Sequence, residues 1–330
     1  ELAVLERSGF VESRHVGVAI ALDPDGTVVR SMGDVETVMF PRSCLKPLQA
    51  ATMIALGAPL TGVERALATA SHSGSDEHVT VVEGMLARGG FTVDDLQCPP
   101  AWPQDVAART AMIRADHGPS RLRMNCSGKH AAMLLACQAQ GWSTADYLDP
   151  GHPLQQATVE VIAQAAGEAV DVIGVDGCGA PVFGLSLHGL ARAVAWATAA
   201  WAGEVDSGEV RSGEVRSGDL AAAAAEVMAA VAADPWAIQG HGLDNTIVIA
   251  ELSTFAKVGA EGVIVMTAPS GHVVAAKFLD GSSRASSVVA LDLLVGAGAL
   301  DRAAVDAVLP QLHLDIAGGD SVVGRIRSVV

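Results

Sequence analysis

Aromatic side chains are scarce in this sequence of 330 residues, which contains six Phe, five Trp and one Tyr. Half of the residues are nevertheless hydrophobic, so Ala, Val and Leu must fill the interior. A chain of this length is long enough to bury a large core, either as one large α/β unit or as two interleaved layers.

Positive charge is also scarce, because 21 Lys and Arg residues stand against 37 Asp and Glu, a net charge of −16. The sequence has no basic stripe, which argues against nucleic acid and anionic membranes as partners. The longest apolar run, Leu220–Ala233, is short, Ala-rich and carries Glu226, so it is not a membrane span. No charged-then-apolar leader opens the sequence, and we expect a cytoplasmic protein.

A disulfide framework is not expected either. The cysteines are odd in number and unevenly spaced: Cys44, Cys98, Cys126, Cys137 and Cys178. This usage is typical of a reduced protein whose thiols are free or bind a metal.

Two periodicities divide the chain. β-Rich runs predict strands at Val16–Ala21, Thr27–Ser31, Thr246–Leu252, Val263–Thr267 and Val273–Leu279. Helical spacing predicts helices at Ser43–Leu56, Glu64–Ala70, Glu77–Arg88, Gln104–Arg114, Lys129–Gln140, Pro153–Ala166, Leu185–Ala202, Leu220–Ala233 and Arg284–Leu294. Strands at both ends with helices between them predict an α+β fold, in which one antiparallel sheet is built from distant segments and a helical layer is inserted.

We interpret residues 1–330 as a single unit. Its strand-rich layer comes from about 1–40 and 245–330, and its helical middle from about 43–240. Within residues 203–218 a five-residue Gly, Glu, Val and Ser unit nearly repeats, which predicts a mobile surface loop without a catalytic role.

The most informative motif places Ser43 three residues before Lys46, at the start of a predicted helix. Residues at i and i+3 share a helix face, so the amine can approach the hydroxyl. A lysine whose pKa is lowered can act as the base that a serine nucleophile needs. Taken alone, the spacing also arises often by chance.

Four further segments combine reactive residues with turn glycines: 71–74 (Ser-His-Ser-Gly), 125–130 (Asn-Cys-Ser-Gly-Lys-His), 176–181 (Asp-Gly-Cys-Gly-Ala-Pro) and 257–262 (Lys-Val-Gly-Ala-Glu-Gly). Each has an ordinary structural reading as a helix cap, a buried thiol, a turn aspartate or a surface lysine. Their common position at element ends favours an active site.

Together these motifs resemble the bacterial asparaginase II family of the Rhizobium etli type, in the same order from about Val16 to Asp280. The resemblance implies the serine β-lactamase and glutaminase-like fold, a homodimer, and an L-asparagine amidohydrolase. It also implies two Ser–Lys pairs in one pocket, Ser43 with Lys46 and Ser71 with Lys257.

The resemblance further implies a Zn²⁺ ion bound by Cys126, Lys129 and Cys178, with water as the fourth ligand and Asp176 close by. The ion is not necessarily required for turnover. A lysine ligand must be neutral, which the charge of the metal can enforce.

The expected mechanism is covalent acyl transfer. We favour Ser43 as the nucleophile, although the sequence leaves Ser71 open. The α-ammonium of asparagine needs an anion, for which Asp176 is suitable, and its α-carboxylate needs Arg42 or His130.

Three alternatives stay open. The first is a glutaminase, because one methylene changes discrimination by only about 1–3 kcal/mol. The second is a penicillin-recognising hydrolase, although the chain has no S-x-N element between its two lysine motifs. The third is a zinc-binding protein without catalytic activity.

Overall fold

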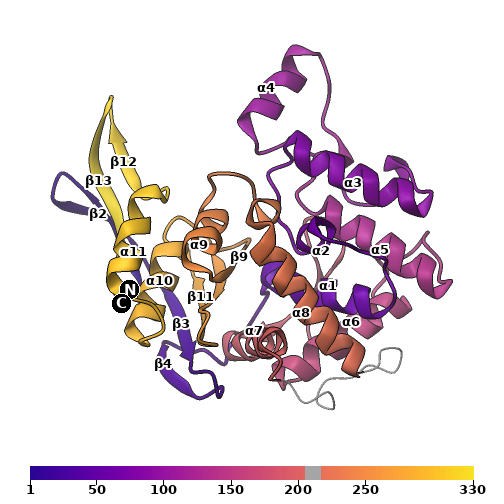
Figure 1. Cartoon of the computed structure of the whole chain (residues 1–330). Coiled ribbons are helices and arrows are strands. Elements are labelled where there is room, and N and C mark those ends of the chain that lie inside the picture. The colour runs from indigo at the N-terminus through magenta and orange to yellow at the C-terminus, as the bar shows by residue number, and fades with distance from the viewer. Residues whose placement is uncertain (205–216) are drawn as a thin grey trace.

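The two ends of the chain meet in one antiparallel sheet. In this computed structural model, which describes residues 1–204 and 217–330, β1 (Ala3–Arg7) lies between β2 (Phe10–His15) and β13 (Ser321–Ser328). The strand β12 (Asp315–Gly318) forms the outer edge beyond β13. Both termini therefore lie side by side (Figure 1).

A second, five-stranded antiparallel sheet carries four of the five segments that the sequence predicted as strands, together with β9, which was not predicted. Its order is β4-β3-β11-β10-β9, with β3 at Gly17–Leu22, β4 at Val28–Met32, β9 at Phe255–Gly259, β10 at Val263–Thr267 and β11 at Val273–Phe278. The α+β class is confirmed. The expectation of a single sheet is wrong, because β1 and β13 belong to the separate four-stranded sheet. These two strands pair across nearly the whole sequence, and local sequence patterns do not indicate such a pairing.

The predicted strand Thr246–Leu252 is instead the helix α9 (Asp244–Leu252). Its buried residues Asn245, Thr246, Val248 and Ile249 recur with helical spacing, and the helix packs on β9. β-Branched residues lower helix propensity only slightly, so tertiary packing overrides it here.

The middle of the chain is helical. Its helices are α1 (Lys46–Ala55), α2 (Val63–Ala68), α3 (Asp76–Gly89), α4 (Val106–Arg114), α5 (Ser127–Gln140), α6 (Pro153–Ala166), α7 (Leu187–Ala202) and α8 (Ser217–Ala233), and α10 (Ser286–Gly296) and α11 (Arg302–Val308) follow near the C-terminus. The predicted helices have these positions, with ends that differ by a few residues. Short two-stranded sheets join β5 (Val38–Met39) to β8 (Leu185–Ser186) and β6 (Ile173–Val175) to β7 (Pro181–Phe183).

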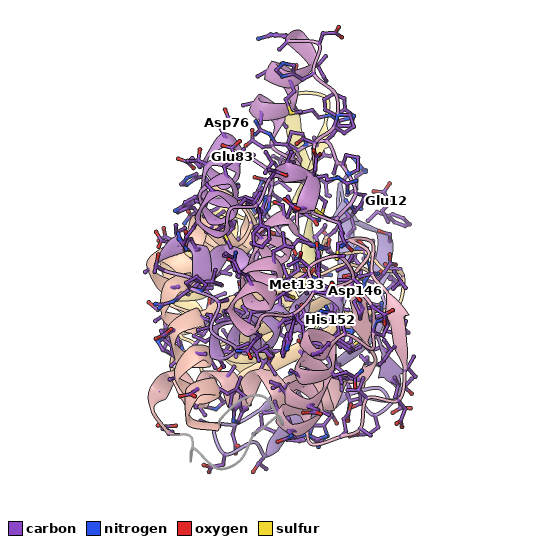
Figure 2. All side chains as sticks on the ribbon, turned by 90° about the vertical axis from the view of Figure 1, so that its right-hand side faces the viewer. Glu12, Asp76, Glu83, Met133, Asp146 and His152 are labelled. Carbon is purple, nitrogen blue, oxygen red and sulfur yellow. The ribbon has the colours of Figure 1, made fainter. Side chains whose placement is uncertain are left out.

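The five-stranded sheet separates two layers of helices. The helix α7 packs on β11 and β3, whereas α10 packs on β11 and β10 from the other side (Figure 1). Figure 2 views the molecule from the helical side, where Asp76 and Glu83 of α3 reach solvent and Met133 of α5 is 1% exposed. The buried residues of sheet and helices form one continuous core.

The repeated five-residue unit and most of the expected loop 203–218 lie outside the described residues. Among the helices that the structure describes, none combines the length and apolar character that a membrane span requires.

Candidate active site

The hydroxyl of Ser71 lies between two buried lysine amines. Its Oγ is 3.0 Å from Nζ of Lys46, the first residue of α1, and 2.9 Å from Nζ of Lys257 in the edge strand β9. Ser71 itself follows α2, and its backbone N–H donates to the carbonyl of Ile238 at 3.0 Å. Three elements that are far apart in the sequence thus place one hydroxyl against two amines.

The two amines differ in their hydrogen-bond partners. Lys46 contacts three acceptors, the carbonyl of Ala70, the Ser71 hydroxyl and the Cys126 sulfur at 3.1 Å, which matches the three donors of an ammonium. Lys257 Nζ donates to the carbonyl of Val258 at 2.7 Å, and its other hydrogen bond in the part of the chain that the structure describes is to Ser71. The lone pair of a neutral Lys257 is therefore suited to accept the Ser71 proton.

The electrostatics agree with this assignment. Lys257 is fully buried, and desolvation lowers its pKa from 10.5 to about 7, with a further contribution from the positive charge of Lys46. A large fraction of Lys257 is consequently neutral near pH 7, as a general base requires.

Ser43 is not paired with Lys46 as its i,i+3 spacing predicts. Ser43 lies in the 3₁₀ turn η1 (Arg42–Leu45), and its hydroxyl makes no hydrogen bond within residues 1–204 and 217–330. A buried ammonium needs several acceptors, and the side chain of Lys46 reaches them at Ala70, Ser71 and Cys126.

The turn η1 nevertheless packs directly against β9. A Cβ at Gly259 would lie 2.8 Å from the carbonyl oxygen of Pro41, so only glycine permits this approach. The thiol of Cys44 also donates to the carbonyl of Lys257 at 3.1 Å. These contacts bring the segment with Ser43 next to the strand that carries Lys257.

Arg42 and Asp176 form an ion pair at the cleft beside the lysines. Nε and Nη2 of Arg42 lie 2.9 and 2.6 Å from the same oxygen of Asp176, which belongs to the turn between β6 and β7. Both residues line a small cleft together with Lys46 and Lys129. Arg42 has a φ of +53°, a sparsely populated conformation for a residue with a side chain, and such strain is often found at functional sites.

The predicted metal ligands are gathered and buried. Lys129 Nζ lies 3.5 Å from the sulfur of Cys178, and Cys126 and Cys178 lie close enough to change each other's pKa. Gly128 allows α5 to begin here against α2, because a Cβ would lie 2.6 Å from the carbonyl oxygen of Leu67. All five cysteines of the chain are free.

This cluster concentrates negative charge on one sulfur. The interaction with the thiol of Cys126 and then the charge of Lys129 lower the pKa of Cys178, whereas the pKa of Cys126 is raised by its interaction with Cys178 and by burial. Burial opposes the charged form of Lys129, but Cys178, Cys126 and Asp176 outweigh it and raise its pKa. A metal ion that binds the Lys129 amine would have to displace a proton from its ammonium.

His130 belongs to the cysteine cluster and not to the cleft. It is completely buried in α5, and its Nδ1 lies 2.8 Å from the hydroxyl of Tyr147, whereas its Nε2 has no hydrogen-bond partner among the described residues. Cys178 is close enough to affect its pKa, which burial lowers. Because His130 has no accessible surface, it does not line the cleft, whereas Arg42 does.

Two residues of the site were not predicted. The Nδ1 atom of His72 accepts from the N–H of Gly74 at 3.1 Å, so its Nε2 donates to Ser127 at 2.9 Å and ties the Ser71 loop to α5. The quoted 71–74 motif contained this histidine without a role for it. The second residue is Tyr147. It is the single tyrosine of the chain, and this rarity in the composition could have marked it as a candidate site residue.

Among groups of three or more His, Cys, Asp and Glu side chains, none in residues 1–204 and 217–330 is arranged to bind a metal. The predicted donor set differs, since it has two thiols and an amine. Its donors, the sulfurs of Cys126 and Cys178 and the amine of Lys129, lie buried together, and N and S donors of this kind fit Zn²⁺.

The sequence model of the L-asparaginase II family matches residues 3–328. No curated protein matches the chain.

Solved structures similar to this chain include two described as β-lactamases. A presumed β-lactamase from Bacteroides dorei DSM 17855 is 14% identical, with a TM-score of 0.44, 85% of this chain and 92% of that chain covered. A β-lactamase from Mycobacterium bovis is 14% identical, with a TM-score of 0.40 and coverages of 86% and 95%. Simvastatin synthase from Aspergillus terreus is 11% identical, with a TM-score of 0.31 and coverages of 80% and 86%.

Proposed function

Because the chain belongs to the L-asparaginase II family, we propose that it is an amidohydrolase that converts L-asparagine into L-aspartate and ammonia. The observation that carries the proposal is the position of Ser71 between Lys46 and Lys257, 3.0 and 2.9 Å from their amines. The narrower Rhizobium etli type within the family stays a prediction.

Ser71, rather than Ser43, is the proposed nucleophile. Neutral Lys257 takes the Ser71 proton while Oγ forms a bond to the amide carbon of the substrate. The ammonium of Lys46 faces the developing negative charge. The N–H of Ser71 donates to the carbonyl of Ile238 and is not free for an oxyanion hole.

The tetrahedral intermediate then collapses. Its C–N bond breaks, and Lys257 returns the proton to the departing nitrogen, which leaves as ammonia. Water attacks the β-aspartyl ester, Lys257 accepts a proton from that water, and the C–O bond breaks. The proton passes to Ser71, and L-aspartate is released.

The ion pair of Arg42 and Asp176 supports an α-amino acid as substrate. A carboxylate can replace Asp176 as the partner of Arg42, and an ammonium can replace Arg42 as the partner of Asp176. A ligand that separates Arg42 from Asp176 leaves two charged side chains without their partners. Only a zwitterion supplies both a carboxylate for Arg42 and an ammonium for Asp176, so only a zwitterion keeps the cost of desolvating these side chains small.

A Zn²⁺ ion is part of the proposal, held by Cys126, Lys129 and Cys178 with water as the fourth ligand. The bound ion would supply a fixed positive charge close to Asp176 and the cleft. A homodimer is likewise a prediction, which size-exclusion chromatography with light scattering tests.

The deciding experiment measures ammonia release from L-asparagine, with L-glutamine in parallel, by wild type, Ser71→Ala and Ser43→Ala. We expect release from L-asparagine, its loss in Ser71→Ala and residual activity in Ser43→Ala. Loss in Ser43→Ala alone would return the nucleophile to Ser43. A wild type that is inactive on both amides, with and without zinc, contradicts the proposal.

A further inference from the structure

A second cavity of about 240 Å³ lies on the opposite face of β9 from the active site. Lys257 and Val258 are consecutive in this strand, so their side chains point to opposite faces of the sheet. The α9–α10 cavity, as we call it, is lined by residues that include Gln239, Asp244, Asn245, Val258, Arg284 and Ser287.

Several hydrogen-bonding groups that line this cavity have no partner in the part of the chain that the structure describes. Ser287 is 3% exposed and its hydroxyl makes no hydrogen bond there. Asn245 is 1% exposed, and its Nδ2 is buried without a partner. Buried polar groups are nearly always hydrogen-bonded, so the buried amide of Asn245, beside a Ser287 hydroxyl that is open to the cavity, indicates a missing ligand.

One side of the cavity favours an anion. The guanidinium of Arg284 is exposed and makes no ion pair within residues 1–204 and 217–330. Two residues later the eleven-residue helix α10 begins, with no side-chain cap and no acidic residue in its first turn. A helix N-terminus and an unpaired arginine both attract a carboxylate.

The other side carries a negative charge. Asp244 begins α9, and one of its oxygens accepts from Nδ1 of His313 at 2.7 Å and from the backbone N–H of the same residue at 3.2 Å. The carboxylate has a second oxygen that makes no hydrogen bond in the described chain. An ammonium can bind there.

We propose that the α9–α10 cavity binds a free α-amino acid, with its carboxylate towards Arg284 and the start of α10 and its ammonium towards Asp244. A simple anion would use only one side of the cavity and would be repelled by Asp244. The zwitterion satisfies both charges and offers acceptors and donors to Ser287 and Asn245.

The walls of this cavity also contact Lys257 and the loop that carries Ser71. The carbonyl of Val258 accepts from Lys257 Nζ at 2.7 Å, and the carbonyl of Gln239 accepts from the N–H of Ser73 at 2.6 Å. A ligand that shifts Val258 or Gln239 therefore changes the position of Lys257 relative to Ser71. The bound amino acid is accordingly an effector of turnover, a part of the proposal that rests on the proposed function.

Binding is tested on the full chain with Ser71→Ala, which removes turnover. The probe is glycine, followed through the ring ¹H–¹⁵N signals of His313, which are assigned with His313→Gln. We expect a saturable shift with glycine, and affinities at least about tenfold weaker for acetate and methylammonium, which carry one charge each.

Two arginine variants separate this cavity from the active site. Arg284→Ala should weaken glycine binding at His313 by about tenfold or more, whereas Arg42→Ala should leave it unchanged. Arg284 is exposed, so its replacement should not impair folding, and Ser287→Ala provides a second variant with a small change in volume.

Three results would overturn the site: no saturable shift with glycine, an equal response in Arg284→Ala, or saturation by inorganic phosphate without any by glycine. The effector role is tested separately by the glycine dependence of kcat, which should disappear in Arg284→Ala and persist in the control Arg14→Ala. A chain without amidohydrolase activity would contradict the proposed function and leave the binding result valid.

Discussion

The amine of Lys257 lies 2.9 Å from the hydroxyl of Ser71, although 186 residues separate them in the sequence. The strand β9 supplies the amine and the loop after α2 supplies the hydroxyl. Lys46 approaches the same oxygen from α1, so the site needs the sheet and the helical layer to be in place at once.

Replacing Lys257 by Met should leave the volume of the side chain almost unchanged and remove the base. We expect kcat to fall by about 10²–10⁴-fold, the usual contribution of a positioned general base. Steady-state ammonia release measures it. Lys277→Met on β11, which is separated from β9 by β10 in the same sheet, is the matched control and should retain activity. Equal activity of both variants would exclude Lys257 as the base.

The pH dependence follows from the lowered pKa of Lys257, about 7 in the folded chain against 10.5 in a model peptide. The amine must be neutral to accept a proton, so kcat/KM should rise with pH up to about 7 and level off above it. Lys46→Met removes a positive charge that helps to lower this pKa, and any residual activity should therefore titrate at higher pH. A wild-type profile that falls through this range is incompatible with a neutral Lys257.

Asp176→Asn should raise the KM for L-asparagine more than it lowers kcat, because the α-ammonium loses its anion. A charge-assisted hydrogen bond contributes about 1.5–3 kcal/mol, which corresponds to roughly 10- to 150-fold. Amides without an α-ammonium should be affected far less by the change. If the KM rises by the same factor for both kinds of substrate, Asp176 acts only by holding Arg42.

Zinc binding is measured most directly by metal analysis of the purified chain. We expect about one Zn²⁺ per chain in wild type and almost none in Cys178→Ser, since zinc sites of this kind depend on thiolate ligands. Cys137→Ser replaces a buried cysteine outside the cluster and should keep the metal. Equal zinc content in the two variants would remove Cys178 from the ligand set.

The sequence predicted most elements of the helical layer, because their hydrophobic spacing is local information. Pro153–Ala166 and Val263–Thr267 were predicted with their observed ends. The predicted strand 246–252 became a helix because packing on β9 outweighed a weak propensity. The sheet formed by β1 and β13 was missed, since neither strand can indicate a partner at the other end of the chain.

For the site, the sequence by itself determined which residue types were present and that the family's motifs occurred in order. It did not determine their pairing. Only the tertiary structure placed Lys46 on Ser71 instead of Ser43, since a buried ammonium takes the acceptors that the fold offers, whatever their sequence separation. It also buried His130 away from the cleft and joined Arg42 to Asp176. Local spacing fixes which side chains share a helix face, whereas burial, charge and hydrogen bonding across elements decide which of them meet.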